Sequence, residues 1–302
     1  MNYITEINKL KKEKNAVILA HCYQNVEIDE VADYIGDSLY LSQMAEKTNA
    51  DIIIFAGVYF MAQTAKILNP SKKVILPNLN AGCAMADMIN LQQLREFKKQ
   101  NPNIPTVCYI NSTAEVKSEC DICCTSSNAV KIVKSLNSPK VLFLPDQNLG
   151  RWVEKELGNV EIITYNGYCP IHNNLGTKNI KETKLKYPKA LVLAHPECKE
   201  EFLDQADYVG STTGIINYVK NSKHDEYIIA TEEGVVQRLK RDYPNKKFYN
   251  VKDIPAICQS MKLITLENIY NSLKNETPQI EVDKEISQKA LKCINRMLEV
   301  SK

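Results

Sequence analysis

A cysteine recurs along this chain at a nearly constant interval, and each time it closely follows a predicted strand. Cys169 lies 86 residues after Cys83, and Cys258 lies 89 residues after Cys169. The apolar runs that precede the three cysteines cover residues 74–77, 160–165 and 247–251. Such runs, bounded by Asn, Gly or Pro, are typical of buried strands, and open α/β sheets bind ligands at the carboxyl ends of their strands. We therefore predict a threefold repeat with a three-thiolate site where the repeats meet.

Other polar residues occupy matching places in the three predicted repeats. The first strands, residues 16–21, 106–111 and 190–195, end at His21, Asn111 and His195. The first crossover helices are predicted to start at Ser38, Ser126 and Thr212. Because strands that alternate with helices form parallel sheets, we expect all these positions, and the three cysteines, at one end of their sheets.

The predicted fold class is therefore α/β, with three small αβα (Rossmann-like) units related by a pseudo-threefold axis. Each unit has a parallel sheet, and the units surround a central site. We place them at residues 1–86, 87–171 and 172–260. Residues 261–302 are predicted to form helices, over 261–273 and 282–300, that pack on this body.

Composition and charge exclude several classes of partner. The chain has 302 residues with 38 basic and 36 acidic side chains, a net charge of +2, which gives no electrostatic reason to expect nucleic acid or an anionic membrane. No apolar run approaches the ~20 residues that span a bilayer, and the N-terminus does not have the pattern of a signal peptide. We expect a cytoplasmic location, where ten cysteines indicate metal binding or catalysis rather than a disulfide framework.

Three converging thiolates without a fourth protein ligand leave a metal with one open coordination position. For zinc an open position indicates catalysis, and in an iron–sulfur cluster it leaves one iron free to bind substrate. The alternative, three unrelated buried thiols, is disfavoured by the repeat. The remaining seven cysteines are expected to pack as small apolar residues: Cys22, Cys108, Cys120, Cys123, Cys124, Cys198 and Cys293. For Cys120, Cys123 and Cys124, redox or metal chemistry is the less favoured alternative.

Hydroxyls at helix starts indicate an anion site. Ser38, Ser126 and the Ser211-Thr212 pair would each present a hydroxyl beside free backbone N–H groups, an arrangement that binds carboxylate or phosphate. The alternative for each is plain helix capping. Their expected position around one axis favours the binding interpretation.

Acid–base groups lie next to the predicted ligands. His195 is followed two residues later by Glu197, and His172 comes three residues after Cys169, where an imidazole can donate a proton or orient a metal ligand. No Gly-x-Gly-x-x-Gly and no Gly-x-x-x-x-Gly-Lys-Ser/Thr occurs. A nucleotide cofactor therefore has no support.

Several segments carry a resemblance to a known family. They are residues 35–38 (IGDS), 82–88 (GCAMADM), 167–172 (GYCPIH), 194–197 (AHPE), and Cys258 with 261–262 and 265–267. Through them, and over nearly its whole length, the chain resembles the quinolinate synthases. The resemblance implies three pseudo-symmetric α/β domains around one 4Fe–4S cluster, held by the thiolates of Cys83, Cys169 and Cys258 with one iron left open.

The resemblance also implies a reaction in de novo NAD biosynthesis. Iminoaspartate (iminosuccinate) would condense with dihydroxyacetone phosphate to quinolinate, with loss of phosphate and water, and the open iron would act as a Lewis acid. The implied partner is the L-aspartate oxidase or dehydrogenase that supplies iminoaspartate. Two alternatives stay open: another 4Fe–4S hydro-lyase acting on a hydroxy acid, and a non-catalytic iron–sulfur sensor, which would not need the hydroxyl and imidazole groups.

Individual roles follow from the same resemblance. The implied substrate-binding residues are His21, Ser38, Tyr109, Ile110, Asn111, Ser126, His195, Pro196, Glu197, Ser211 and Thr212, and the implied catalytic residues are Tyr23, His172, His195 and Glu197. The chain departs from the family at Ala84 and Gln259, where proline is common, which affects loop stiffness and not ligand identity. Some members carry a C-terminal Cys-x-x-Cys; here Cys293 stands alone, so a regulatory disulfide of that kind is not expected.

Overall fold

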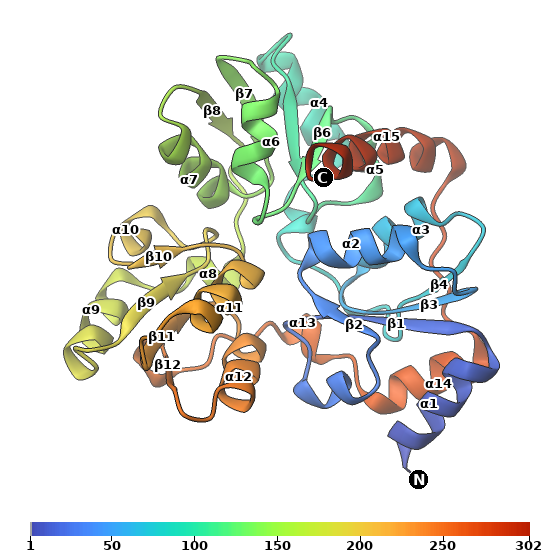
Figure 1. Ribbon diagram of the computed structural model, residues 1–302. Helices are drawn as coiled ribbons and strands as arrows, with labels where there is room; N and C mark the ends of the chain where they lie inside the picture. The colour runs from blue at the N-terminus through green and yellow to red at the C-terminus, as the bar shows by residue number, and fades with distance from the viewer. Residues whose placement is uncertain (1) are drawn as a thin grey trace.

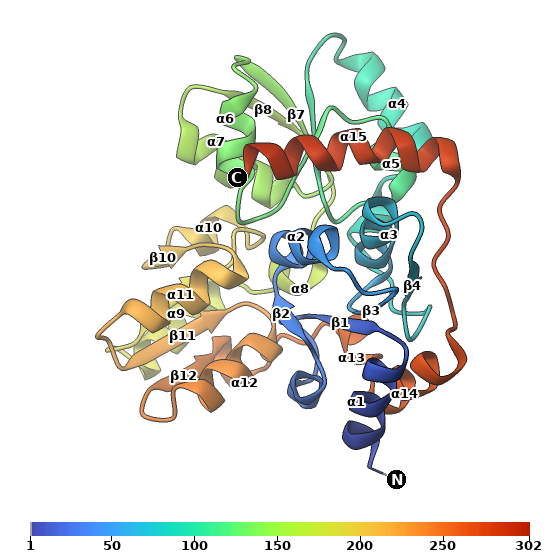
Figure 2. The same ribbon diagram turned by 45° about the vertical axis from the view of Figure 1, so that its right-hand side comes forward.

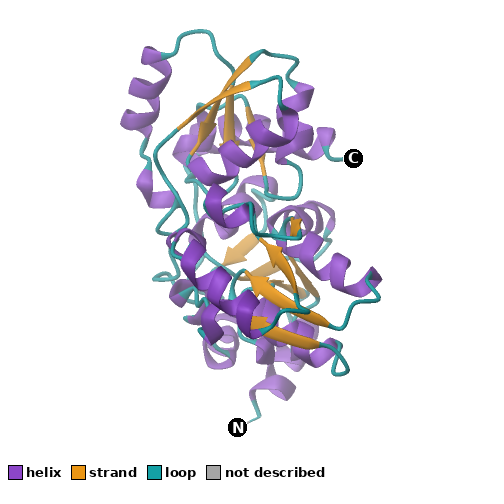
Figure 3. Ribbon diagram, turned by 90° about the vertical axis from the view of Figure 1, so that its left-hand side faces the viewer, coloured by secondary structure: helices purple, strands orange, loops and turns teal. Residues whose placement is uncertain are grey.

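The computed structural model describes residues 2–302 and contains three four-stranded parallel sheets, which surround the middle of the molecule (Figure 1). The strand orders are β2-β1-β3-β4, β6-β5-β7-β8 and β10-β9-β11-β12, so one topology occurs three times. Helices cover the faces of the sheets (Figure 3), as parallel sheets require because both faces are apolar. The predicted α/β fold with three repeated units is confirmed; its boundaries at residues 86, 171 and 260 remain predictions.

The first sheet has a fully buried strand, β3, in its interior. It contains β1 (Ala16–His21), β2 (Tyr34–Gly36), β3 (Ile52–Ala56) and β4 (Lys73–Ile75), with α1 (Tyr3–Glu13), the 3-10 helix η1 (Val26–Glu30), α2 (Ser38–Lys47) and α3 (Tyr59–Leu68). Every residue of β3 is buried, because three consecutive isoleucines and a phenylalanine fit a strand covered on both faces.

The second and third sheets repeat this arrangement. The second contains β5 (Thr106–Tyr109), β6 (Ile122–Cys124), β7 (Lys140–Leu144) and β8 (Glu161–Thr164), with η2 (Ala86–Met88), α4 (Leu91–Gln100), α5 (Ala114–Ser118), α6 (Ala129–Ser135) and α7 (Gln147–Leu157). The third contains β9 (Leu191–Ala194), β10 (Tyr208–Val209), β11 (Glu226–Ala230) and β12 (Lys247–Asn250), with α8 (Pro170–Asn173), α9 (Thr177–Lys186), α10 (Glu200–Leu203), α11 (Thr212–Asn221), α12 (Glu233–Asp242) and η3 (Val251–Asp253).

The C-terminal segment returns to the first two units. Helix α13 (Gln259–Lys262) lies near the middle of the molecule, α14 (Leu266–Asn275) packs on α1, and α15 (Lys284–Val300) crosses α5 and β6 of the second unit (Figure 2). The single helix predicted over 261–273 is thus wrong: it is two helices, because Thr265 caps α14 by accepting a hydrogen bond from Asn268 N at 3.1 Å. No helix among residues 2–302 combines the length and the hydropathy needed to cross a membrane.

One aspartate in each unit closes the same local structure. The carboxylates of Asp33, Asp121 and Asp207 accept the backbone N–H fifteen residues upstream, at 2.8, 2.7 and 2.8 Å. The backbone N–H of each aspartate donates in return to the carbonyl of the same upstream residue. These paired bonds join the segment before the short edge strand to the first strand of its sheet, so the repeat extends to individual hydrogen bonds.

A buried ion pair joins the first and third units. Arg238 of α12 donates to the carbonyl oxygens of Cys22 at 2.6 Å and Gln24 at 2.9 Å, and its guanidinium also contacts the Asp29 carboxylate. The side chains of Arg238 and Asp29 are 5% and 6% exposed. This pair therefore holds the loop after β1, which carries Tyr23, against the third unit.

Candidate active site

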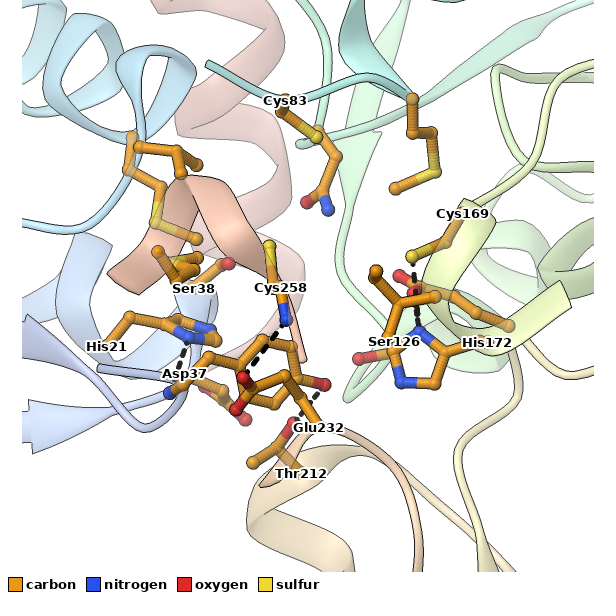
Figure 4. A pocket seen from close by; sticks show the side chains of 18 of the residues that line it. His21, Asp37, Ser38, Cys83, Ser126, Cys169, His172, Thr212, Glu232 and Cys258 are labelled. Carbon is orange, nitrogen blue, oxygen red and sulfur yellow. Dashed lines mark hydrogen bonds and ion pairs between the residues drawn. The ribbon is translucent and has the colours of Figure 1, made fainter. Parts of the chain in front are cut away.

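A cavity opens where the three units meet, at the carboxyl ends of the strands of all three sheets (Figure 4). Its walls combine thiols, hydroxyls, imidazoles and carboxyl groups with a few apolar side chains. The lining residues are His21, Tyr23, Asp37, Ser38, Val58, Phe60, Met61, Gly82, Cys83, Met85, Tyr109, Asn111, Thr125, Ser126, Cys169, Ile171, His172, His195, Glu197, Thr212, Glu232, Cys258 and Met261. Of the predicted site residues, Ile110, Pro196 and Ser211 do not line the cavity.

The three cysteines of the repeat point into this one space (Figure 4). Each starts a turn of helix: the carbonyls of Cys83, Cys169 and Cys258 accept backbone N–H groups four residues on, at 3.1, 2.9 and 3.3 Å. Burial raises the pKa of the Cys83 thiol to about 12 and also raises the pKa values of the Cys169 and Cys258 thiols. A bound metal ion supplies the positive charge that deprotonates such thiols, so the donor set fits a metal centre ligated by three thiolates.

Carboxylates hold the backbone of two of these cysteines. The N–H of Cys169 donates to Asp146 at 3.1 Å, and that of Cys258 donates to Glu232 at 3.2 Å. Asp146 and Glu232 both cap the second crossover helix of their unit. The first unit has Val58 at the matching place, so the loop of Cys83 lacks this contact. The threefold repeat is therefore imperfect at the cavity.

The hydroxyls of Ser38 and Thr212 are not helix caps, contrary to the capping alternative. Asp37 caps α2 by accepting from Tyr40 N at 3.0 Å, and Ser211 caps α11 by accepting from Gly214 N at 3.1 Å. Both hydroxyls are thus left for the cavity. The prediction that Ser126 starts a helix is also wrong, because α6 begins at Ala129, so its hydroxyl is available as well.

Glu197 is a cavity carboxylate that contacts Tyr109 and both neighbouring histidines. Its Oε1 accepts from the Tyr109 hydroxyl at 2.6 Å, and its Oε2 lies 2.7 Å from His172 Nδ1 and 3.7 Å from His195 Nδ1. Burial would raise the pKa of Glu197, but the two imidazoles and the hydrogen bonds from His172 and Tyr109 hold it below the ordinary value. Glu197 is therefore ionised and accepts hydrogen bonds from Tyr109 and His172.

His21 and His195 adopt the same tautomer for the same local reason. Nδ1 of His21 accepts the backbone N–H of Tyr23 at 3.2 Å, and Nδ1 of His195 accepts that of Glu197 at 3.4 Å. The proton therefore resides on Nε2 of each neutral ring. Burial lowers the pKa of His21 to about 4 and that of His195 to about 3. Both rings are neutral N–H donors, and Nε2 of His195 lies 3.2 Å from the Ser126 hydroxyl.

A chain of hydrogen bonds crosses the cavity wall from Thr212 to Glu197. The Thr212 hydroxyl donates to Tyr23 Oη at 3.1 Å, Tyr23 Oη lies 3.0 Å from Thr231 Oγ1, and Thr231 Oγ1 lies 2.9 Å from His172 Nε2. His172 then contacts Glu197. Such a chain can move a proton between a tyrosine and a carboxylate without exposing either to bulk water.

The His172 ring also approaches one of the cysteines. Its Nδ1 lies 3.2 Å from Cys169 Sγ, and donor atoms of Cys169, His172 and Glu197 all fall within 4.8 Å of one another. These three could hold a metal ion. The 2.7 Å distance between His172 and Glu197 is that of a charge-assisted hydrogen bond, which places the imidazole between the thiol and the carboxylate.

Sequence reasoning missed four polar residues of this region. Asp37, Thr125 and Glu232 line the cavity, and the buried Thr231 completes the hydrogen-bond chain. Thr231 and Glu232 directly follow β11, a place where site residues were expected in the other strands. Their position at a strand end was therefore the signal that could have identified them.

Comparisons with known proteins cover nearly the whole chain. The model of the family described as "Quinolinate synthetase A protein" matches residues 5–299. Relatives named quinolinate synthase include those of Alkaliphilus metalliredigens, 52% identical over 299 residues (99% of this chain and 98% of the relative), and of Clostridioides difficile, 49% identical over 292 residues (97% and 96%). A protein of Methanosarcina acetivorans named quinolinate synthase 2 is 48% identical over 296 residues (98% and 95%).

Proposed function

Since the chain belongs to the quinolinate synthetase A family, we propose that its cavity condenses iminoaspartate (iminosuccinate) with dihydroxyacetone phosphate to quinolinate, with loss of phosphate and water. The observation that carries this proposal is the union, in one buried cavity, of three thiols with a set of neutral donors suited to carboxylates and phosphate. An L-aspartate oxidase or dehydrogenase would supply the unstable imine.

The thiols of Cys83, Cys169 and Cys258 would hold a 4Fe–4S cluster with one iron free of protein ligands. When bound, that cluster supplies a Lewis acid for a substrate oxygen or nitrogen.

Neutral groups of the protein bind and orient the substrates. The hydroxyls of Ser38, Ser126 and Thr212 and the Nε2–H groups of His21 and His195 line the cavity from the three units. Carboxylates and phosphate accept hydrogen bonds from such donors, and a buried anion gains more from them than it would in water. The Asn111 amide adds both a donor and an acceptor.

Proton transfers are assigned to Glu197 and its neighbours. Glu197 is ionised, so it can take a proton from a carbon or nitrogen of the substrate. His172 and Thr231 connect it to Tyr23, whose hydroxyl faces the cavity from the first unit. Tyr23 then donates its proton to a leaving hydroxyl. The chain of hydrogen bonds returns a proton from the protonated Glu197 to Tyr23.

The test begins with protein purified without oxygen. About four irons per chain, as a 4Fe–4S cluster requires, are expected in the parent and in Cys120→Ala, and they should be lost in Cys83→Ala, Cys169→Ala and Cys258→Ala. Quinolinate should form only from iminoaspartate and dihydroxyacetone phosphate together. An iron-free parent would refute the centre, while a cluster without quinolinate formation would point to a sensor, and turnover of a hydroxy acid without phosphate would point to a hydro-lyase.

A further inference from the structure

A second group of cysteines lies outside the cavity lining, where α15 packs on the second unit. Cys108 and Cys123 are directly paired on β5 and β6, Cys293 lies on α15, and Cys120 precedes β6. Cys123 Sγ lies 3.1 Å from Cys293 Sγ, although 170 residues separate them in sequence. Cys123 and Cys293 are 0% and 1% exposed. This distance is about 1 Å longer than a disulfide bond, so a small shift of α15 would close it.

A buried lysine accompanies these thiols. Lys117 is 0% exposed; its ammonium donates to the Ser112 carbonyl and lies 5.4 Å from the centre of the Phe60 ring. Among the described residues no carboxylate lies within ion-pair distance of it. Burial lowers the pKa of Lys117, whereas the nearby thiols of Cys123 and Cys108 raise it. In the folded core this ammonium helps to lower the pKa of the Cys108 thiol, whereas burial raises the pKa of the Cys123 thiol, so a reactive thiolate of Cys123 requires local unpacking.

The end of α15 reaches the cavity through two polar contacts. Asn128 donates to Ser301 Oγ, just beyond α15, at 2.8 Å, and Asn128 Oδ1 accepts from Thr125 N at 2.6 Å. Thr125 and Ser126 line the cavity. The position of α15 on the second sheet therefore supports the turn that presents Ser126.

We propose that Cys123 and Cys293 form a reversible disulfide that fixes α15 on the second sheet and steadies the Thr125–Asn128 turn of the cavity. The oxidant is a small-molecule disulfide. One cysteine of the pair, as its thiolate, attacks a sulfur of the small disulfide and releases one small thiol; the thiolate of the other cysteine then attacks the mixed disulfide at the protein sulfur and releases the second. Two protons leave the cysteines, and their two electrons reduce the small disulfide to two thiols. Local unpacking of α15, the last helix of the chain, admits the oxidant.

The experiment equilibrates the full-length protein, without oxygen, in buffers of fixed oxidised-to-reduced glutathione ratio. Acid quenching, unfolding, alkylation and peptide mass analysis then report each cysteine. We expect a cross-linked peptide pair containing Cys123 and Cys293, two hydrogens lighter than the reduced pair, with the other cysteines alkylated. Cys124→Ser, which removes the neighbouring buried thiol of β6, should keep the cross-link, and Cys293→Ser should abolish it. The oxidised parent should unfold at least about 5 °C higher.

Several outcomes would overturn the proposal. Alkylated Cys123 and Cys293 in the most oxidising buffer would exclude the disulfide, and so would a stable glutathione adduct on Cys123 without cross-linking. The peptide map of the parent decides this even if Cys293→Ser does not fold. For the cavity, we expect amide hydrogen exchange of residues 125–129 to slow several-fold on oxidation in the parent but not in Ser301→Ala, which keeps both cysteines. Equal exchange in both redox states would refute the link to the cavity.

Discussion

Glu197 shows how far one side chain depends on residues distant in sequence. Its partners Tyr109 and His172 come from the second unit and the segment after it, and His195 comes from its own strand end. Without them, burial would favour the protonated acid. The chemistry assigned to Glu197 therefore requires the assembled cavity and not only the local His-Pro-Glu sequence.

Replacing this carboxylate tests its role directly. Glu197→Gln keeps the size of the side chain and removes the base, so we expect kcat for quinolinate formation to fall by about 10²- to 10⁴-fold with iron content unchanged. Glu201→Gln, on the exposed side of α10, is the control and should retain parental turnover. Near-normal turnover of Glu197→Gln would remove Glu197 from the chemistry.

The two neutral histidines predict a pH dependence of stability. An unfolded histidine has a pKa of about 6.5, whereas burial lowers that of His21 to about 4 and that of His195 to about 3. Below pH 6.5 the unfolded chain binds protons that the native rings do not, so the free energy of unfolding falls as pH decreases toward 4. The loss is about 1 kcal/mol per histidine between pH 6.5 and 5.5.

Urea denaturation between pH 7.5 and 5.5 measures this loss. His21→Gln and His195→Gln should each show a shallower dependence of unfolding free energy on pH than the parent. A dependence as steep in both variants as in the parent would mean that other groups cause it.

At the residue scale, the sequence predicted site residues best where an equivalent residue recurs in all three units. Cys83, Cys169 and Cys258 were predicted from spacing, and the cavity brings them together. Asp37 was missed because a carboxylate before a helix is an ordinary cap, and its Oδ2 also accepts from Ser127 of the second unit at 2.6 Å. A contact between units leaves no local pattern in the sequence.

At the element scale, apolar strands were predictable and short edge strands were not. Runs such as residues 52–56 stand out by β-branched composition, whereas β2, β6 and β10 have only two or three residues. What holds these short strands is the aspartate before each of them, which bonds the first strand of its sheet. The helices α4 and α9 were missed because they are polar and rich in lysine, with few buried positions.

The three aspartates should have similar energetic roles. Asp33→Ala, Asp121→Ala and Asp207→Ala each leave one backbone N–H of a first strand without its partner, so we expect each to lower the free energy of unfolding by about 1 kcal/mol. Urea denaturation measures this. Glu299→Ala, an exposed carboxylate on α15, should change stability by less than about 0.5 kcal/mol. A neutral effect at all three aspartates would show that the edge strands do not need them.

At the scale of the whole molecule, the units are joined by contacts that the repeat does not contain. Arg238 and Asp29 are 209 residues apart and buried between the first and third units. Asp29 also pairs with Arg241, which is 48% exposed, at 2.7 Å. One carboxylate thus has a buried and an exposed arginine partner, which makes an internal comparison possible.

The variants Arg238→Met and Arg241→Met test how burial changes the contribution of each arginine to stability. Loss of Arg238 leaves Asp29 and two backbone carbonyls without their buried donor, so we expect the free energy of unfolding to fall by about 3 kcal/mol. Loss of the half-exposed Arg241 should cost less than about 1 kcal/mol. Urea denaturation of both variants, with turnover measured below the transition, checks this. Equal losses would mean that burial of the pair does not govern its contribution.

Because all three units contribute to one cavity, the order in which they are synthesised decides when the cavity can be completed. Domains fold in order as a chain is synthesised, and the third thiol of the cavity, that of Cys258, comes after the strands of all three sheets. A centre held by all three thiols cannot be complete on a nascent chain that has only its first two units. The 4Fe–4S cluster proposed for this cavity would therefore be completed only after the third unit has been synthesised, so we expect the donor of its iron and sulfide to act on a chain that already contains all three units.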